Sequence, residues 1–328
     1  MDKEKQAHCI RNRTSAKESK MQIIGENIHI ISPRVKEAMA NRDGAFFVDL
    51  ARRQKEAGAW ALDLNIGPQK KAGPEVMSWL VDVIQEAVGN QVPLSLDTTN
   101  LAAIEAGLKR VSRGKAIVNS ISAQPERLAS LPPLLAQYGA QVIALTMAES
   151  GIPVSAEARV SICLETLMPR LEEAGVPMED VIIDPLVLTV SGCQEYVPQC
   201  VEAVRILKNA GLPCKVSVGL SNVSNAVPAA NRPLINRVYM VQLMAAGLDM
   251  AIADPLDADL AELIRIVETR DESTPVGKLL VTLYDRTAAT EELQPEDVDM
   301  NDPQQAALWK TVRILLNKTI YADAYLTI

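Results

Sequence analysis

The chain has 328 residues, of which 48% are hydrophobic and 23% are charged, so it has enough apolar surface for a complete core and lacks the bias of a disordered or coiled-coil protein. Its net charge of −8 and isoelectric point near 5.1 argue against nucleic acid as a partner, because phosphate binding depends on clustered Lys and Arg. No run approaches the roughly 18 apolar residues of a membrane-spanning helix, and we expect a cytoplasmic protein that does not bind a membrane.

The cysteines do not have the spacing of a metal site. Their number is odd, no CxxC pair occurs, and the chain has only two histidines to add as ligands. We therefore expect no tightly bound metal and reduced thiols, as is usual in a cytoplasm, at Cys9, Cys163, Cys193, Cys200 and Cys214.

The first 20 residues are basic and are followed by no apolar stretch, so they do not resemble a signal peptide. We expect a disordered basic leader over residues 1–20 and a single domain over residues 21–328.

From residue 21 onwards, short runs of strand-forming residues alternate with amphipathic helical patterns. Val76, Leu80, Val83 and Ile84, for example, fall on one face of a helix. The expected strands are residues 21–28, 60–66, 92–98, 115–121, 141–147, 181–188, 214–220 and 248–253.

A glycine stands shortly before most of the later strands, where a helix end needs a residue that tolerates a positive φ. These glycines are Gly58, Gly89, Gly107, Gly139, Gly175, Gly211 and Gly247. About eight βα units with nearly continuous apolar strands predict an α/β fold in which a parallel sheet closes as a (β/α)₈ TIM barrel, with an open doubly wound sheet as the alternative.

In a closed barrel the active site lies at the carboxyl ends of the strands. Almost every expected strand ends in an acid or an amide, although one such residue alone would more simply cap a helix or start a turn. Few cations occupy these ends, which favours a neutral, donor-rich heterocycle over a phosphate ligand. The residues are Glu26, Asn27, Asp63, Asn65, Asp97, Asn119, Thr146, Asp184, Ser221, Asn222 and Asp254.

Seven ordered motifs at these ends carry a resemblance. They are GEN (25–27), LDLNIGP (62–68), LDTTN (96–100), NSIS (119–122), IIDPL (182–186), GLSNVSN (219–225) and RPLINR (232–237). The chain resembles the pterin-binding barrel family, and within it the methyltetrahydrofolate:corrinoid-protein methyltransferases, which are related to dihydropteroate synthase and to the folate domain of cobalamin-dependent methionine synthase. The likeness spans residues 21–260 and resumes at 314–326, which resembles the family's final helix.

The resemblance implies how the pterin is bound. Asp97, Asn119 and Asp184 would bind the amino group and ring nitrogens along one edge of the pterin, since carboxylates and amides pair with such an edge. Gly219 and Ser221 would let the backbone approach the ring.

The resemblance also implies the reaction, which moves a methyl group between N5 of tetrahydrofolate and the cobalt of a corrinoid protein, in either direction. Asn222 would be catalytic, through a hydrogen bond to N5 that strengthens as charge develops there. Arg232 would close the same wall or steer the anionic tail of the folate. The corrinoid is carried by the partner protein, and we expect a homodimer.

Two alternatives remain open. Dihydropteroate synthase shares the pterin site but must stabilise a departing pyrophosphate, for which the chain offers Lys215 and Arg232 beside the acids Asp254 and Asp257. A catalytically silent folate-binding protein is the other.

An extra segment, residues 268–302, separates the eighth strand region from the final helix and contains the acidic run 291–299. We expect an insertion here, either a surface excursion or a lid or docking surface for the corrinoid protein.

Overall fold

A computed structural model describes residues 20–69, 71–89, 91–112 and 114–327. The expected leader, residues 1–20, lies outside the described residues except for Lys20.

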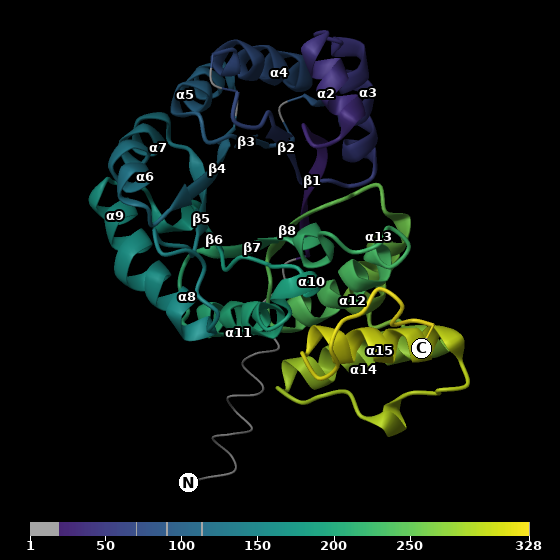
Figure 1. Ribbon diagram of the computed structural model, residues 1–328. Helices are drawn as coiled ribbons and strands as arrows, with labels where there is room; N and C mark the ends of the chain where they lie inside the picture. The colour runs from purple at the N-terminus through teal and green to yellow at the C-terminus, as the bar shows by residue number, and fades with distance from the viewer. Residues whose placement is uncertain (1–19, 70, 90, 113, 328) are drawn as a thin grey trace.

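Eight parallel strands form a closed barrel in chain order, with β1 paired to both β2 and β8 (Figure 1). This closure confirms the TIM barrel and excludes the open sheet. The strands are β1 (Gln22–His29), β2 (Ala61–Asn65), β3 (Leu94–Asp97), β4 (Ile117–Ser122), β5 (Gln141–Leu145), β6 (Val181–Asp184), β7 (Lys215–Gly219) and β8 (Met250–Ala253).

Helices surround the barrel (Figure 1). They are α2 (Pro33–Ala40), α3 (Gly44–Glu56), α4 (Gly73–Val88), α5 (Leu101–Arg110), α6 (Pro125–Ser130), α7 (Pro132–Tyr138), α8 (Ala156–Ile162), the π-helical turn η2 (Cys163–Leu167), α9 (Met168–Glu173), η3 (Met178–Asp180), α10 (Val190–Cys193), α11 (Tyr196–Asn209), η4 (Leu220–Ser224), α12 (Arg232–Ala245), α13 (Ala258–Thr269), α14 (Pro275–Ala288), η5 (Pro295–Asp297) and α15 (Pro303–Leu315).

Polar side chains cap several of these helices. Asp43 accepts a hydrogen bond from the backbone N–H of Phe46 at the start of α3, and Asn100, Asp257 and Thr274 cap α5, α13 and α14 in the same way. Each cap satisfies a backbone donor that the helix itself leaves unpaired.

Six of the seven glycines expected at helix ends have φ between +60° and +98°: Gly58, Gly89, Gly139, Gly175, Gly211 and Gly247. The prediction was wrong for Gly107, which lies inside α5. A Cβ atom at that position would come within 2.7 Å of Met77 Cγ and 2.9 Å of Leu96 Cδ1. Gly107 is therefore a packing glycine that brings α5 close to α4 and β3.

The barrel interior has two layers. Inward-facing residues on six strands make the lower one, a buried apolar cluster of Ile24, Ala61, Ile117, Ile143, Ile182 and Met250. Strand side chains alternate between faces, so the positions two residues further along these six strands also face inwards. Four of those positions carry Glu26, Asp63, Asn119 and Asp184, and the other two carry Leu145 and Ile252. A hydrophobic floor thus supports a largely polar upper layer.

The last two helices lie outside the ring of barrel helices (Figure 1). α14 packs against α12 and α13, and α15 packs against α12. The extra segment therefore contains a regular helix with buried Leu279, Leu280 and Leu283.

The acidic run within this segment is held by ion pairs. Arg286 of α14 pairs with Glu291 at 2.9 Å and with Asp297 at 3.1 Å, and Lys318 pairs with Glu292 at 2.9 Å. These pairs fasten the loop between α14 and α15 to the rest of the protein.

Residues 314–326 do not form the final helix. The helix is α15, which ends at Leu315, because Asn317 has a φ of +57° and the N–H groups of Lys318 and Thr319 turn back to the carbonyl of Arg313. The following segment, residues 316–327, lies against the loops after β6 and β7. There Gln194 donates to the carbonyls of Ile314 and Thr319.

Candidate active site

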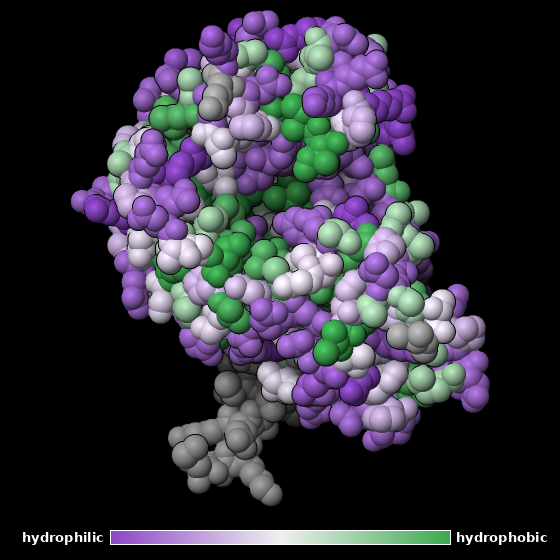
Figure 2. Space-filling view, in the orientation of Figure 1, coloured by the Kyte–Doolittle hydropathy of each residue, from purple (hydrophilic) through white to green (hydrophobic). Residues whose placement is uncertain are grey.

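The carboxyl ends of the strands carry a cluster of acids and amides that face one another. Their side chains line the opening of the barrel, around which apolar residues also gather (Figure 2). In β1 and β4 the pairing register slips by one residue, between Gly25 and Ile28 and between Asn119 and Ile121. Such bulges re-aim side chains.

Asp63 and Asp97 form the centre of the cluster on β2 and β3. Asp63 Oδ1 accepts hydrogen bonds from Ser95 Oγ at 2.5 Å and from Asn119 Nδ2 at 3.2 Å, and Asn65 donates to Asp97. Burial raises the pKa of Asp63, and burial together with the charge of Asp63 raises the pKa of Asp97 to about 9. The pair therefore holds a proton at neutral pH.

Asp184 ends β6 and is buried. Its Oδ1 accepts a hydrogen bond of 2.7 Å from the backbone N–H of Leu186, two residues further on. Burial raises the pKa of Asp184 to about 7, against the opposing effects of the Leu186 hydrogen bond and the charge of Arg159. One further hydrogen bond to the carboxylate would lower this pKa, and Asp184 would then be ionised at neutral pH.

The loop after β7 presents Asn222 to solvent at the barrel opening. The strand ends at Gly219, one residue earlier than expected, and continues as the 3₁₀ turn η4. A Cβ at Gly219 would lie 2.8 Å from Asn222 Nδ2, so glycine leaves room for the amide. Asn225 Nδ2 donates to Asn222 Oδ1 at 3.1 Å and thereby orients that amide.

Ser221 and Arg232 have partners of their own. Ser221 Oγ donates to Glu26 Oε2 at 2.9 Å, and Arg232 Nε donates to Ser224 Oγ at 3.2 Å. The charge of Arg232 also acts on Glu26. Ser221 and Arg232 therefore lie on the same side of the barrel opening as Glu26, and their contacts stabilise that side.

β1 and β8 complete the ring. Asn27 Nδ2 donates to Asp254 Oδ1 at 2.9 Å. Burial raises the pKa of Glu26 to about 7, against the opposing effect of the hydrogen bond from Ser221 and with smaller contributions in the same direction from the charges of Asp254 and Asp63. At neutral pH this carboxyl is therefore divided between its protonated and ionised forms.

The structure brings together the residues predicted to bind the pterin on β3, β4, β6 and β7. The expectation that Thr146 lines the barrel opening was wrong. Thr146 is completely buried and faces away from the barrel interior, because the inward positions of β5 are Ile143 and Leu145. Asp63 was expected at a strand end but not as a site residue, although the motif LDLNIGP contains it. Arg159 was missed, since a helical arginine gives no signal in the sequence.

Metal-ligand clusters and membrane-crossing helices are both absent from the described ranges 20–69, 71–89, 91–112 and 114–327. No group of three or more His, Cys, Asp or Glu side chains there has an arrangement that would hold a metal ion. Within the same ranges, no helix is both long enough and apolar enough to cross a membrane.

Comparison with known proteins gives a consistent result. The sequence profile described as pterin binding enzyme matches residues 32–254. A methylcorrinoid:tetrahydrofolate methyltransferase of Eubacterium limosum is 29% identical over 242 residues, which cover 73% of this chain and 87% of that protein. A methionine synthase of Mycobacterium tuberculosis is 31% identical over 247 residues, which cover 72% of this chain but 20% of that much longer protein.

Among solved structures, dihydropteroate synthase from Thermus thermophilus superposes with a TM-score of 0.55 at 20% identity, covering 76% of this chain and 93% of that one. This likeness concerns the fold.

Proposed function

The chain belongs to the family of pterin-binding enzymes, and from that premise we propose that it moves a methyl group between N5 of tetrahydrofolate and the cobalt of a corrinoid protein. The observation that carries the proposal is the match to the Eubacterium limosum methyltransferase over 87% of that protein's length. The arrangement of the site supports it.

The site suits one edge of a pterin. Asp97 on β3, Asn119 on β4 and Asp184 on β6 offer carboxyl oxygens and an amide from three walls of the opening. A pterin edge donates from its amino group and ring N–H, and a pair of carboxylates with an amide complements that pattern. Binding would ionise the carboxyls, because those donors favour the charged form.

We assign to Asn222 the hydrogen bond to the reacting atom N5. As the bond between N5 and the methyl carbon breaks, its electron pair stays on N5, which becomes a stronger hydrogen-bond acceptor and finally takes a proton. With Asn222 Oδ1 held by Asn225, the Nδ2 group remains as the donor. Such a bond is stronger in the transition state than in the ground state, and this difference increases the rate.

The geometry does not favour dihydropteroate synthase. Lys215 lies at the start of β7, at the opposite end of the barrel from the site, where it donates to Gln22 Oε1 at 3.1 Å. Arg237 is paired with Asp257 at 2.7 Å and with Asp259 at 3.0 Å. Of the two cations that the sequence offered for a departing pyrophosphate, Lys215 therefore lies away from the site, and Arg232 remains beside Glu26 and Ser224.

The test is anaerobic methyl transfer from methylcobalamin to tetrahydrofolate, followed by the cobalamin spectrum and repeated with a corrinoid protein. Asn222→Ala should lower kcat about 10²-fold while folate affinity is largely kept. Asn225→Ala should have a smaller effect, since it only orients Asn222, and Asp184→Ala should weaken folate binding.

Two outcomes would decide against the proposal. Tight folate binding without transfer to or from either cobalt carrier would favour a silent folate-binding protein. Pyrophosphate release from a dihydropterin pyrophosphate would favour the synthase.

We further propose a homodimer with a separate corrinoid-protein partner, and a monomer mass by light scattering would contradict the dimer.

A further inference from the structure

Arg159 of α8 is the largest side chain among the described residues that has essentially no exposed surface. Four neutral carbonyls accept hydrogen bonds from it: Nε donates to Pro153 O at 3.0 Å, Nη1 to Pro185 O at 3.0 Å and to Leu186 O at 2.9 Å, and Nη2 to Tyr196 O at 3.3 Å. Over residues 20–69, 71–89, 91–112 and 114–327, no carboxylate forms an ion pair with it. A buried cation in this situation is costly unless an opposite charge lies near.

The opposite charge is available at the site. Asp184 immediately precedes Pro185 and Leu186, whose carbonyls Arg159 binds. Leu186 has a φ of +68°, an unfavourable conformation for a branched side chain. Asp184 holds the N–H of Leu186 at 2.7 Å, and Arg159 holds its carbonyl at 2.9 Å. The Asp184 carboxyl and the Arg159 guanidinium therefore stabilise the same turn, residues 184–186, one through the N–H and the other through the carbonyl of Leu186.

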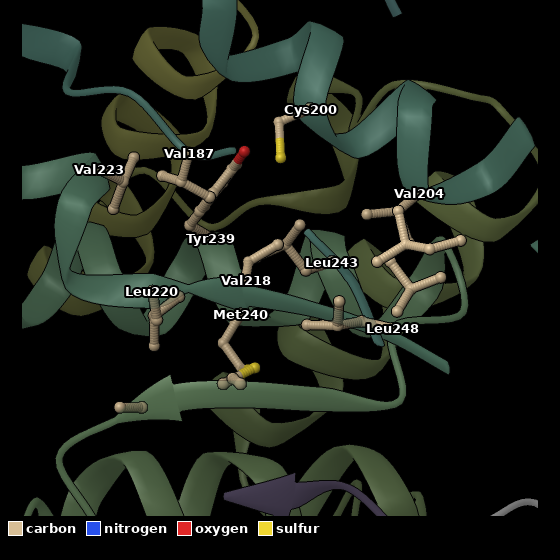
Figure 3. Packing of buried hydrophobic residues seen from close by; sticks show 14 of the residues in the cluster. Val187, Cys200, Val204, Val218, Leu220, Val223, Tyr239, Met240, Leu243 and Leu248 are labelled. Carbon is tan, nitrogen blue, oxygen red and sulfur yellow. The ribbon is translucent and has the colours of Figure 1, made fainter. Parts of the chain in front are cut away.

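The neighbouring titratable groups are uncharged. Burial raises the pKa of Cys200 on α11 to about 12, and it raises the pKa of Tyr239 on α12 as well. The Tyr239 hydroxyl donates to Val197 O at 2.9 Å, and Figure 3 shows it directed towards Cys200, with Val187 beside it. Of the charged groups that act on Asp184, Arg159 is thus the one that favours its anion.

We propose that Arg159 is a positioning residue for Asp184, acting as the counter-charge that lets this carboxyl bind the pterin as an anion and as the brace that fixes the turn at residues 184–186. The second part of the role follows from geometry alone. The first part rests on the proposed function, because it assumes that Asp184 binds the pterin.

A purely structural arginine would brace the turn without affecting ionisation, and pH separates the two roles. We would measure tetrahydrofolate affinity anaerobically from pH 5.5 to 8.5 in wild type, Arg159→Lys and Arg159→Met. Arg159→Met should move the pH at which affinity is half lost upwards by about one unit or more. Arg159→Lys keeps the charge but loses the planar fork, so it should weaken binding several-fold at every pH without moving that midpoint.

A uniform loss of affinity in Arg159→Met, or the same shift of midpoint in Arg159→Lys, would overturn the counter-charge. Thermal unfolding provides a second measurement that needs no folate. At pH 8, Asp184→Asn should raise Tm several degrees more in the Arg159→Met background than in wild type, and at pH 5 it should raise Tm equally in both. If Arg159→Met does not fold alone, the double variant should restore folding.

Equal effects of Asp184→Asn in both backgrounds at pH 8, or a double variant that still does not fold, would contradict the coupling. The two failures remain distinguishable. A wild-type protein that binds no tetrahydrofolate would reject the proposed function, while the unfolding experiment would still decide whether Arg159 balances Asp184.

Discussion

The carboxyl groups of Asp63 and Asp97 lie together on β2 and β3 at the centre of the site. Asp63 accepts hydrogen bonds from Ser95 and Asn119 and stays the better anion, while the pKa of Asp97 is raised to about 9. One proton is therefore held where the pterin is proposed to bind, and it must leave or move when the ligand's own donors arrive.

Asp63→Asn removes the charge that, after burial, does most to keep Asp97 protonated. Tetrahydrofolate affinity should rise with pH in two steps, the lower one set by Asp184 and the upper one by Asp97, and Asp63→Asn should lower the midpoint of the upper step by about one unit or more. Ser95→Ala removes a hydrogen bond that stabilises the Asp63 anion, so Asp63 carries less charge and the same midpoint should also fall, by a smaller amount. Anaerobic binding titrations from pH 5 to 10 measure both, and midpoints that stay fixed in the two variants would show that the pair does not control binding.

Glu26→Gln should change how stability depends on pH. The folded protein keeps the Glu26 proton up to about pH 7, whereas the unfolded chain releases it near 4.5. The stability that this proton contributes at low pH is therefore lost as the pH rises from 4.5 through 7. Glutamine cannot ionise, so at pH 8 the variant should be the more stable protein by up to about 3 kcal/mol.

Denaturant unfolding at pH 4 and pH 8 tests this, with the exposed Glu157→Gln as the matched control. A difference between Glu26→Gln and wild type that is the same at both pH values would reject the linkage.

Gly107→Ala should destabilise the protein although alanine favours a helix. The new methyl group would come within 3.0 Å of both Met77 and Leu96 in a buried contact. Overpacking of this kind costs about 1–3 kcal/mol, which exceeds the gain in helix propensity of about 1 kcal/mol. Gly44→Ala in α3 is the control, because its nearest atom, Val83 Cγ2, lies 3.8 Å away. If the Gly107→Ala protein is as stable as Gly44→Ala, then Met77 of α4 and Leu96 of β3 can move away from the new methyl group at no cost in stability.

Gln194→Ala should release the C-terminal segment. Gln194 is buried, donates to the carbonyls of Ile314 at 2.8 Å and Thr319 at 2.7 Å, and accepts from the N–H of Tyr321 at 2.8 Å. Its loss leaves these groups unpaired, at about 1–3 kcal/mol for each one that stays buried.

Limited trypsin digestion should then cut faster after Lys318 in Gln194→Ala than in wild type. The exposed Gln304→Ala should be cut at the wild-type rate. If cleavage after Lys318 is equally slow in all three proteins, contacts other than Gln194 hold the segment.

Sequence patterns were sufficient for the barrel because they report burial directly. The four residues from Ala61 to Leu64 in β2 are buried, as expected for a strand between the barrel interior and a layer of helices. The strand-end acids could be predicted for the same reason, since a closed parallel barrel places all carboxyl ends at one opening.

Other features depend on contacts between distant segments and leave no local pattern. Arg159 occupies a helix in which an arginine usually faces water, and only the fold brings it behind Asp184. The bulge in β1 changes which way Asn27 points, although the surrounding residues have the pattern of a regular strand. Gly107 resembles a helix end until the neighbouring α4 is placed against it.

The pairing of β1 with β8 also bears on how the protein is made. The first strand is synthesised early, but its second neighbour begins at Met250. Until the ribosome has passed that point, one side of β1 and one side of β7 are open strand edges, which can pair wrongly with other chains. Glu26 and Asp254 meet only when this seam closes. A nascent chain that stalls before the eighth strand would therefore carry most of the pterin motifs, yet it would lack a finished pocket and would be a natural client for chaperones.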